Sequence, residues 1–288
     1  MHLALKVTAR AIVAACVLGT GGLLAGCVTS PVAPSASRQN TVTGLDIALG
    51  GTQRTAADRR LDPYRHPKAT LLFFGIQPVS RVLQVWPEPG WYTEIIAPLV
   101  RARGRYIAAV IPPDPGSRFL RARLAGYRKL LASRPDLYGG VRVVSFPLNG
   151  ADVLQPGSVD MVVSFGDLHE WMALGEAPQA LATIYRALAP GGAFGVVDNR
   201  GDPALPQDPQ AKSGYVRQDY AIRLIEAAGF KLAASSEVNA NPKDTRNYPA
   251  GVWTLPPDYR LGNIDRARYE AIGESDRFTL RFVKPGAN

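Results

Sequence analysis

Cysteine and histidine are scarce in this chain of 288 residues, which has two cysteines and three histidines. Cys16 lies in an N-terminal stretch that we expect to be removed, so the mature chain would keep Cys27 alone and form no internal disulfide. Structural zinc sites use about four Cys or His ligands. The sequence therefore predicts neither a zinc site nor another cysteine-based metal site.

Signatures of several enzyme classes are missing as well. The chain has no His-Glu-x-x-His motif, no Gly-x-Ser-x-Gly turn and no phosphate-binding loop that ends in Lys-Ser/Thr. Basic residues do not alternate with aromatic ones as they do in single-strand nucleic-acid binders, so no nucleic acid is expected as a partner. The net charge of +9 instead favours solubility and attraction to a nearby anionic surface.

No hydrophobic run reaches the roughly 20 residues that a membrane-spanning helix needs. The apolar stretch 11–25 is shorter and follows Lys6 and Arg10, a pattern typical of a secretory signal peptide. It ends in Leu23-Leu24-Ala25-Gly26-Cys27, which resembles a bacterial lipobox. The resemblance implies cleavage before Cys27 and a lipid on its sulfur. The folded part would then be anchored to a membrane of the bacterial cell envelope and face the periplasm, whereas an uncleaved anchor is the alternative.

Composition divides the chain into three parts. Residues 1–26 are the expected signal peptide. Residues 27–45 hold the lipidated Cys27 and a stretch rich in Ser, Thr, Pro and Ala, which buries too little apolar surface to order itself and is expected to be a flexible tether. Residues 46–288 are expected to form one α/β domain, which begins with an arginine-rich lead-in over 46–66.

Apolar periodicity within the domain predicts strands that alternate with helices. Short apolar runs predict strands, and apolar residues at helical spacing predict helices. The expected strands are 82–86, 106–111, 141–144, 159–165, 193–197, 231–235 and 278–283, and the expected helices are 92–101, 117–133, 177–188 and 218–228. This alternation favours a doubly wound, mostly parallel sheet with helices on both faces. In such sheets ligands bind beyond the carboxyl ends of the strands, near the point where the strand order reverses.

Three segments, taken in order, resemble an exported bacterial subgroup of predicted class I S-adenosylmethionine (SAM)-dependent methyltransferases. They are the loop Trp86-Pro87-Glu88-Pro89-Gly90-Trp91-Tyr92-Thr93, the segment Phe165-Gly166-Asp167-Leu168-His169-Glu170-Trp171, and Asp276-Arg277-Phe278, with Leu188-Ala189-Pro190-Gly191-Gly192 as weaker support. The resemblance covers residues 67–285 and implies a Rossmann-like fold with SAM as cofactor.

The resemblance also implies which residues contact SAM, and it shows departures from the family pattern. The first loop would lie against the methionine part of SAM, and Asp114 would substitute for the acidic residue that relatives place at the end of the second strand, where this chain has Val110. Gln84 stands in place of an acidic residue, and Glu88 and Pro89 stand in place of two glycines. The full set of implied cofactor contacts is Gln84, Trp86, Gly90, Trp91, Tyr92, Thr93, Asp114 and Phe165.

Polar residues after the fourth and fifth strands are candidates for chemistry. His169 is a candidate general base because its charge changes near neutral pH, and Asp167 is a candidate partner; the alternative for His169 is a structural role that orients the loop. Asn199 follows the fifth strand, where groups that contact the acceptor often lie in this fold. Arg277 is expected to be a surface or salt-bridge residue.

From these observations we predict a membrane-tethered SAM-dependent methyltransferase whose methyl acceptor is unknown. The alternative is a methyltransferase-like binding or scaffold module of the cell envelope without catalysis, which the altered first loop favours. A third interpretation is that the strand ends bind another small anion or a nucleoside.

Overall fold

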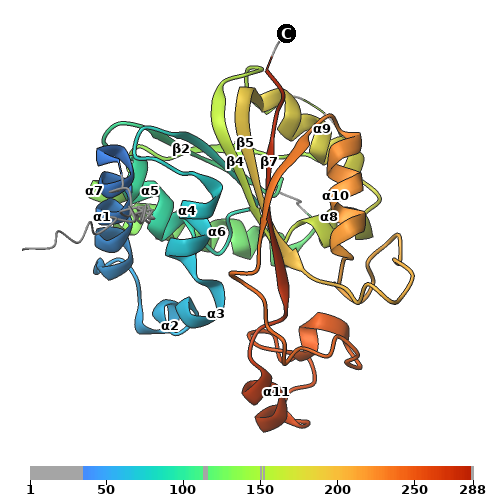
Figure 1. The fold of residues 1–288 in the computed structure, drawn as a ribbon. Coiled ribbons are helices and arrows are strands. Elements are labelled where there is room, and N and C mark those ends of the chain that lie inside the picture. The colour runs from blue at the N-terminus through green and yellow to red at the C-terminus, as the bar shows by residue number, and fades with distance from the viewer. Residues whose placement is uncertain (1–34, 113–115, 150, 152, 287–288) are drawn as a thin grey trace, which may run out of the picture. The chain divides into compact units, whose positions relative to one another are not determined.

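The computed structural model describes residues 35–286, apart from 113–115, 150 and 152. Seven strands form one sheet in the order β3-β2-β1-β4-β5-β7-β6 (Figure 1). The strands are β1 (Arg81–Val85), β2 (Arg105–Val110), β3 (Arg142–Ser145), β4 (Val159–Phe165), β5 (Leu188–Asn199), β6 (Lys231–Ser236) and β7 (Arg277–Val283).

The first five strands in this order are parallel, and β7 is antiparallel to both of its neighbours. The helices are α1 (Ala36–Gly50), α2 (Ala56–Arg59), α3 (Asp62–Arg65), α4 (Pro67–Phe74), α5 (Thr93–Val100), α6 (Arg118–Ser133), α7 (Pro135–Tyr138), α8 (Leu168–Ala173), α9 (Ala177–Ala187), α10 (Gln218–Ala227) and α11 (Arg266–Ile272), with a 3₁₀ helix over Gly251–Thr254. The expected doubly wound, mostly parallel sheet is thus confirmed.

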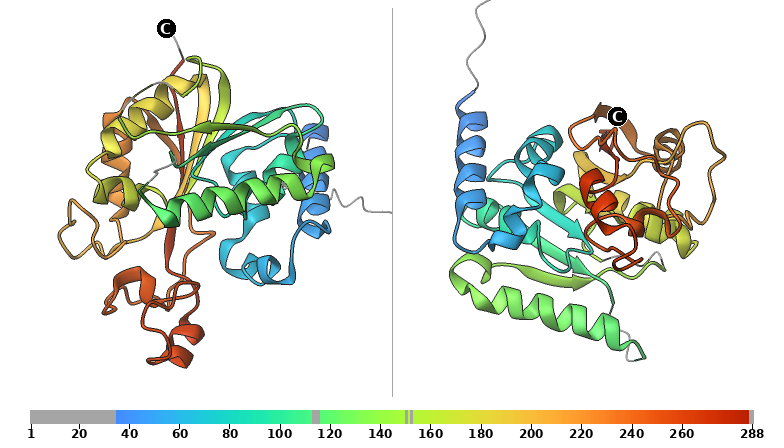
Figure 2. Two further views of the ribbon diagram at one scale, coloured as in Figure 1. Left: turned by 180° about the vertical axis from the view of Figure 1, so that it is seen from behind. Right: turned by 90° about the horizontal axis from the view of Figure 1, so that it is seen from below.

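Alternate residues of the buried strands point into two separate apolar layers. Val82 packs with α1, α4, α5 and α6 on one face, whereas Leu83 and Val85 pack with α8, α9 and α10 on the other. Figure 2 shows these two groups of helices from behind and from below. Since both faces of the central strands are covered, every residue of β1 after Arg81 is buried, as is usual for parallel strands.

The tether expected over 27–45 differs from the structure in its second half. Residues 36–45 belong to helix α1, which begins at the cap Ser35, whose hydroxyl accepts a hydrogen bond from the Arg38 N–H. Thr41, Leu45 and Ala48 are buried at helical spacing. The apolar and polar residues of this helix are only weakly separated onto two sides, so its stability comes from packing that the composition does not reveal. Residues 1–34, including the expected signal peptide and Cys27, lie outside the described residues.

The connection between β6 and β7 was not expected to have structure of its own. It carries the 3₁₀ helix and α11, and its aromatic residues form a small separate core with Tyr215. Figure 1 shows α11 and α3 at the same edge of the sheet, where the parallel strands end and β7 begins. Both termini of the domain therefore contribute to the edge where ligands are expected.

Candidate functional site

A cavity of about 210 Å³ lies at the carboxyl ends of β1 and β4. These strands are neighbours, and the strand order reverses between them, which is the usual ligand site of doubly wound sheets. The cavity is lined by Arg65, Gln84, Trp86, Pro87, Glu88, Pro89, Trp91, Tyr92, Phe165, Gly166, Val197, Asn199 and Arg277. The loop after β1 therefore leaves a hollow despite Glu88 and Pro89.

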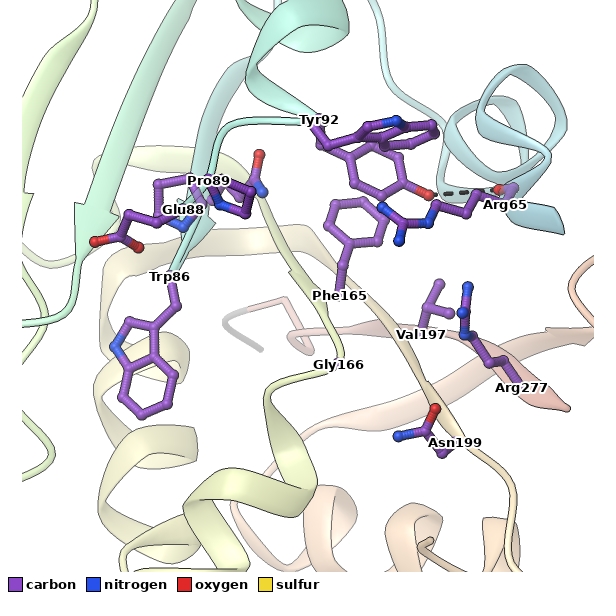
Figure 3. A pocket seen from close by; sticks show the side chains of 13 residues that line it. Arg65, Trp86, Glu88, Pro89, Tyr92, Phe165, Gly166, Val197, Asn199 and Arg277 are labelled. Carbon is purple, nitrogen blue, oxygen red and sulfur yellow. Dashed lines mark hydrogen bonds between the residues drawn. The ribbon is translucent and has the colours of Figure 1, made fainter. Parts of the chain in front are cut away.

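Figure 3 shows that the lining side chains form two groups. Trp86, Glu88 and Pro89 lie on one side, which we call the loop end. Arg65 and Arg277 lie on the other side with Asn199 and Val197, and we call this the arginine end. The stacked rings of Tyr92 and Phe165 lie between the two ends, with centroids 3.4 Å apart and planes 9° apart.

The loop end depends on glycine at position 90. Gly90 has φ +116°, a conformation that other residues rarely adopt, and a Cβ atom there would lie 2.1 Å from Leu130 Cδ2. The Trp86 N–H donates to the Ala109 carbonyl over 2.8 Å, so β1 and β2 remain paired at the start of the loop. Gly90 itself does not line the cavity; it allows the chain to pass close to α6.

Glu88 reaches from this loop to the end of β2. Its Oε1 accepts a hydrogen bond from the Ile111 N–H over 3.3 Å, and Arg123 donates to its carbonyl over 2.9 Å. Its Oε2 is buried without a partner among the described residues. Burial raises the pKa of Glu88, although the nearby Arg123 charge opposes the rise. A carboxylate thus lies at the end of β2, where the resemblance implied one, while Asp114 lies outside the described residues.

The other predicted cofactor contacts divide into residues that line the cavity and residues that do not. Five of them line the cavity: Gln84, Trp86, Trp91, Tyr92 and Phe165. Whether they contact a cofactor stays a prediction. Thr93 does not line the cavity. Its hydroxyl is buried and forms hydrogen bonds with the hydroxyls of Tyr106 and Tyr127. The Gln84 side chain accepts from the same Tyr106 hydroxyl over 2.8 Å.

Trp91 connects the loop to the N-terminal lead-in. Its indole N–H donates to the Asp58 carbonyl over 3.0 Å, and the guanidinium carbons of Arg54 and Arg65 each lie 5.0 Å from its ring centroid. Such cation–π contacts fix aromatic rings in place. The arginine-rich lead-in therefore positions the first loop, and it supplies Arg65 to the cavity.

The candidate catalytic pair, Asp167 and His169, lies beside the cavity and does not line it. His169 Nδ1 lies 2.8 Å from Asp198 Oδ1, and its Nε2 lies 3.5 Å from Glu170 Oε1. Burial by itself lowers the pKa of His169, but the charges and hydrogen bonds of Asp198 and Glu170 outweigh it and raise the pKa to about 10. The imidazole is then charged at neutral pH, a state that does not accept a proton.

Asp167 is fully enclosed next to this histidine. Burial raises its pKa to about 7, although the Ser164 hydroxyl donates to its Oδ2 over 2.7 Å. The carboxyl also accepts from the Phe165 N–H over 3.3 Å, so it fixes the turn that carries Phe165 and Gly166. These contacts favour positioning roles for Asp167 and His169, and a direct catalytic role for either residue stays a prediction.

The arginine end was missed as a ligand surface by sequence reasoning. Arg277 forms a salt bridge with Glu274, one of the two roles expected for it, but it is largely buried in the cavity wall and not on the open surface. It shares the Glu274 carboxylate with Arg65, a residue 209 positions earlier in the chain. The Asp-Arg-Phe segment was the one available signal for this region, whereas nothing marked Arg65 or Glu274.

Within the described residues, no group of three or more His, Cys, Asp or Glu side chains is arranged to hold a metal ion. None of the described helices combines the length and the apolar character that crossing a bilayer requires.

No family model matches the chain, and a search of the curated proteins found no match. Solved structures do match. A SAM-dependent methyltransferase from Aquifex aeolicus has a TM-score of 0.53 and 16% sequence identity over 78% of this chain and 92% of that chain. The [4+2]-cyclase SpnF has a TM-score of 0.54 and 17% identity over 89% of this chain and 98% of that chain. At such identities the likeness concerns the fold, and these two named activities differ on one fold. With its strand order and these neighbours, the chain has the fold of the class I SAM-dependent methyltransferases.

Proposed function

We propose that this chain is a SAM-dependent methyltransferase. The observation that carries the proposal is the cavity at the β1–β4 reversal, with the unpartnered Oε2 of Glu88 at its loop end. The buried Nε1 of Trp86, beside Glu88, also has no acceptor among the described residues. Buried polar groups without partners are costly, so a ligand that offers both a donor and an acceptor would be stabilised here.

These groups fit the polar part of a nucleoside cofactor. Glu88 would accept from a hydroxyl or amino group of SAM, and Trp86 would donate to one of its acceptor atoms. SAM, when bound, supplies an electrophilic methyl group on its sulfonium sulfur. The chain would then contribute mainly by holding the acceptor in line with that methyl group and by excluding water.

Isothermal titration of the full-length protein in detergent with SAM tests this proposal. We expect binding to the wild type, and about tenfold weaker binding to Glu88→Gln, since a hydrogen bond to a charged group contributes about 1.5–3 kcal/mol. Asp160→Asn is the matched control, because Asp160 is a half-exposed carboxylate near the opposite edge of the sheet, paired with Arg81. Absence of heat from SAM with the wild type would refute the methyltransferase proposal.

A binding module without catalysis is the second candidate, and the size of the cavity favours it. Pockets for drug-sized ligands usually measure about 300–1,000 Å³, which exceeds the 210 Å³ found here. Glu88 and Pro89 occupy part of the rim. If the parent binds no SAM but a variant with Glu88→Gly and Pro89→Gly does, the parent is a non-enzyme with a filled cofactor site.

Membrane tethering through a lipid on Cys27 is a further part of the proposed function. It rests on the Leu-Ala-Gly-Cys sequence that precedes the domain. Mass spectrometry of the mature N-terminal peptide from the native host tests it. We expect an acylated peptide that begins at Cys27, and an unprocessed, unacylated chain for Cys27→Ala.

A further inference from the structure

The arginine end contains two guanidinium groups and one carboxylate. Arg65 donates from Nε to both oxygens of Glu274 and from Nη2 to Oε1, over 2.7–3.0 Å, and Arg277 donates from Nη2 to Oε2. Glu274 is 2% exposed, so the pair of arginines shares one fully buried counter-charge. The group as a whole carries one excess positive charge in the cavity wall.

Each guanidinium has one nitrogen, Nη1, that is available to a further hydrogen-bond acceptor. The Nε of Arg277 donates to Ser275 over 3.3 Å, but no described residue accepts a hydrogen bond from Nη1 of either arginine. Both side chains line the cavity and face its interior in Figure 3. Planar guanidinium groups match the geometry of carboxylates and phosphates, which they bind through two parallel hydrogen bonds.

The nearby carboxylates have cations of their own. Asp198, whose charge acts on Arg277, pairs with His169 over 2.8 Å, and Asp62 pairs with Arg54 over 2.6 Å. Asn199 is occupied, because its amide donates to the Gly214 carbonyl over 3.0 Å and its oxygen accepts from the Ser275 hydroxyl over 2.6 Å. Glu88 lies at the other end of the cavity. An anion is therefore the ligand that balances the arginine end.

The walls beside the arginines are apolar and limit the size of the ligand. Tyr92 and Phe165 separate the arginine end from the loop end, and Val197 lies beside Arg277. An apolar cavity of about 150 Å³ is enough to bind benzene, so 210 Å³ has room for a ring-sized body and one carboxylate.

We propose that the arginine end is a binding site for the carboxylate of a small organic acid, whose apolar body packs against Tyr92 and Phe165. This inference deepens the proposed function, because the acid would be the methyl acceptor. The carboxylate of SAM itself has the same chemistry and is the other possible source. The site would bind such an acid even if the chain had lost catalysis.

Benzoate and its neutral counterpart benzamide are the probes, titrated calorimetrically into the full-length protein in detergent. We expect benzoate to bind about tenfold or more tightly than benzamide, as a charge-assisted pair implies. Arg277→Gln should weaken benzoate binding by at least the same factor and leave benzamide unaffected. Arg281→Gln is the control, because Arg281 lies further along β7 and donates to the Phe74 carbonyl away from the cavity.

Equal binding of benzoate and benzamide to the wild type would overturn the proposal, and so would an unchanged benzoate affinity in Arg277→Gln. Should that variant fail to fold, two measurements still test the proposal: the benzoate affinity of Arg65→Gln, which should also fall, and the comparison of benzoate with benzamide on the wild type. Repeating the benzoate titration with SAM present separates the two sources. Competition assigns the site to the carboxylate of SAM, and independent binding assigns it to the acceptor. If SAM gives no heat while benzoate binds, the proposed function fails and the carboxylate site stands.

Discussion

The two ends of the cavity each contain one buried glutamate, and the two carboxylates have opposite properties. Glu88 at the loop end is 6% exposed, and Glu274 at the arginine end is 2% exposed. Burial raises the pKa of Glu88. Burial acts in the same direction on Glu274, but Arg277 and Arg65 outweigh it and hold the pKa of Glu274 below its usual value. Enclosure alone therefore does not decide the charge of a buried carboxylate; its partners do.

This difference assigns the two glutamates different tasks. Glu274 has arginine donors on both oxygens and serves as scaffold, holding Arg65 and Arg277 toward the ligand. Glu88 accepts one weak hydrogen bond from the Ile111 N–H, and its other oxygen has no partner among the described residues, so it is the carboxyl left for the ligand that we propose. The comparison predicts that removing the charge is costly at Glu274 and harmless to folding at Glu88.

The largest effect is expected for Glu274→Gln. Breaking a buried ion pair leaves uncompensated charge on the arginines and costs about 3–5 kcal/mol of unfolding free energy, measured by urea denaturation. Because the pKa of Glu274 is lowered in the folded state, its stabilisation is present above pH 4.5 and is lost as the pH falls below that value. The difference between wild type and variant should therefore shrink in acid.

Asp160→Asn is the control for this loss. Asp160 pairs with Arg81, and both side chains are nearly half exposed, so the change should cost about 0–1 kcal/mol. Equal losses in the two variants would mean that the Glu274 pair contributes no more than a surface pair, and the scaffold role would be wrong.

A smaller loss of unfolding free energy is expected when Gly90 or Gly166 is replaced by alanine, and the loss should be greater at Gly90 in the loop end. Gly90→Ala places a Cβ 2.1 Å from Leu130 Cδ2, whereas Gly166→Ala meets no atom within 4 Å, and both residues have positive φ. Backbone strain costs about 1–2 kcal/mol in each. Overpacking adds about 1–3 kcal/mol at Gly90 alone. Thermal and urea unfolding of the two variants measure the difference, and equal losses would show that the loop has room to shift away from α6.

Sequence alone predicts the sheet well, because its signal is local. The apolar runs of β1 and β4 and the amphipathic pattern of α9 predicted elements that end within a residue or so of the observed bounds. The class I fold follows from the order of these elements. Helix α1 was missed. Only three of its residues are buried, all on one side, and its composition resembles that of a linker.

The site was predicted in part, for the same physical reason. Gln84, Trp86 and Tyr92 belong to one continuous segment after β1, and the sequence placed them together at the cavity. Arg65 and Glu274 come from opposite ends of the chain, and only the folded structure brings them into contact. The position of Glu88 was also unpredictable, because it depends on the loop turning its carboxyl toward the Ile111 N–H.

The smallest effect, and the sharpest test of the comparison, is expected for Glu88→Gln. A folded-state pKa above the unfolded value means that Glu88 contributes fully below pH 4.5 and that this stability is lost as the pH rises through the raised pKa. The amide cannot ionise, so the variant should gain on the wild type as the pH rises above 4.5, by about 1.4 kcal/mol in total for each unit by which the pKa is raised. Urea unfolding between pH 4.5 and 8 measures the gain, with the exposed Glu270→Gln as a control that should follow the wild type. If Glu88→Gln were instead the less stable protein at pH 8, the ionised Glu88 carboxylate would be stabilised by a partner, as that of Glu274 is. The carboxylates at the two ends of the cavity would then have similar properties.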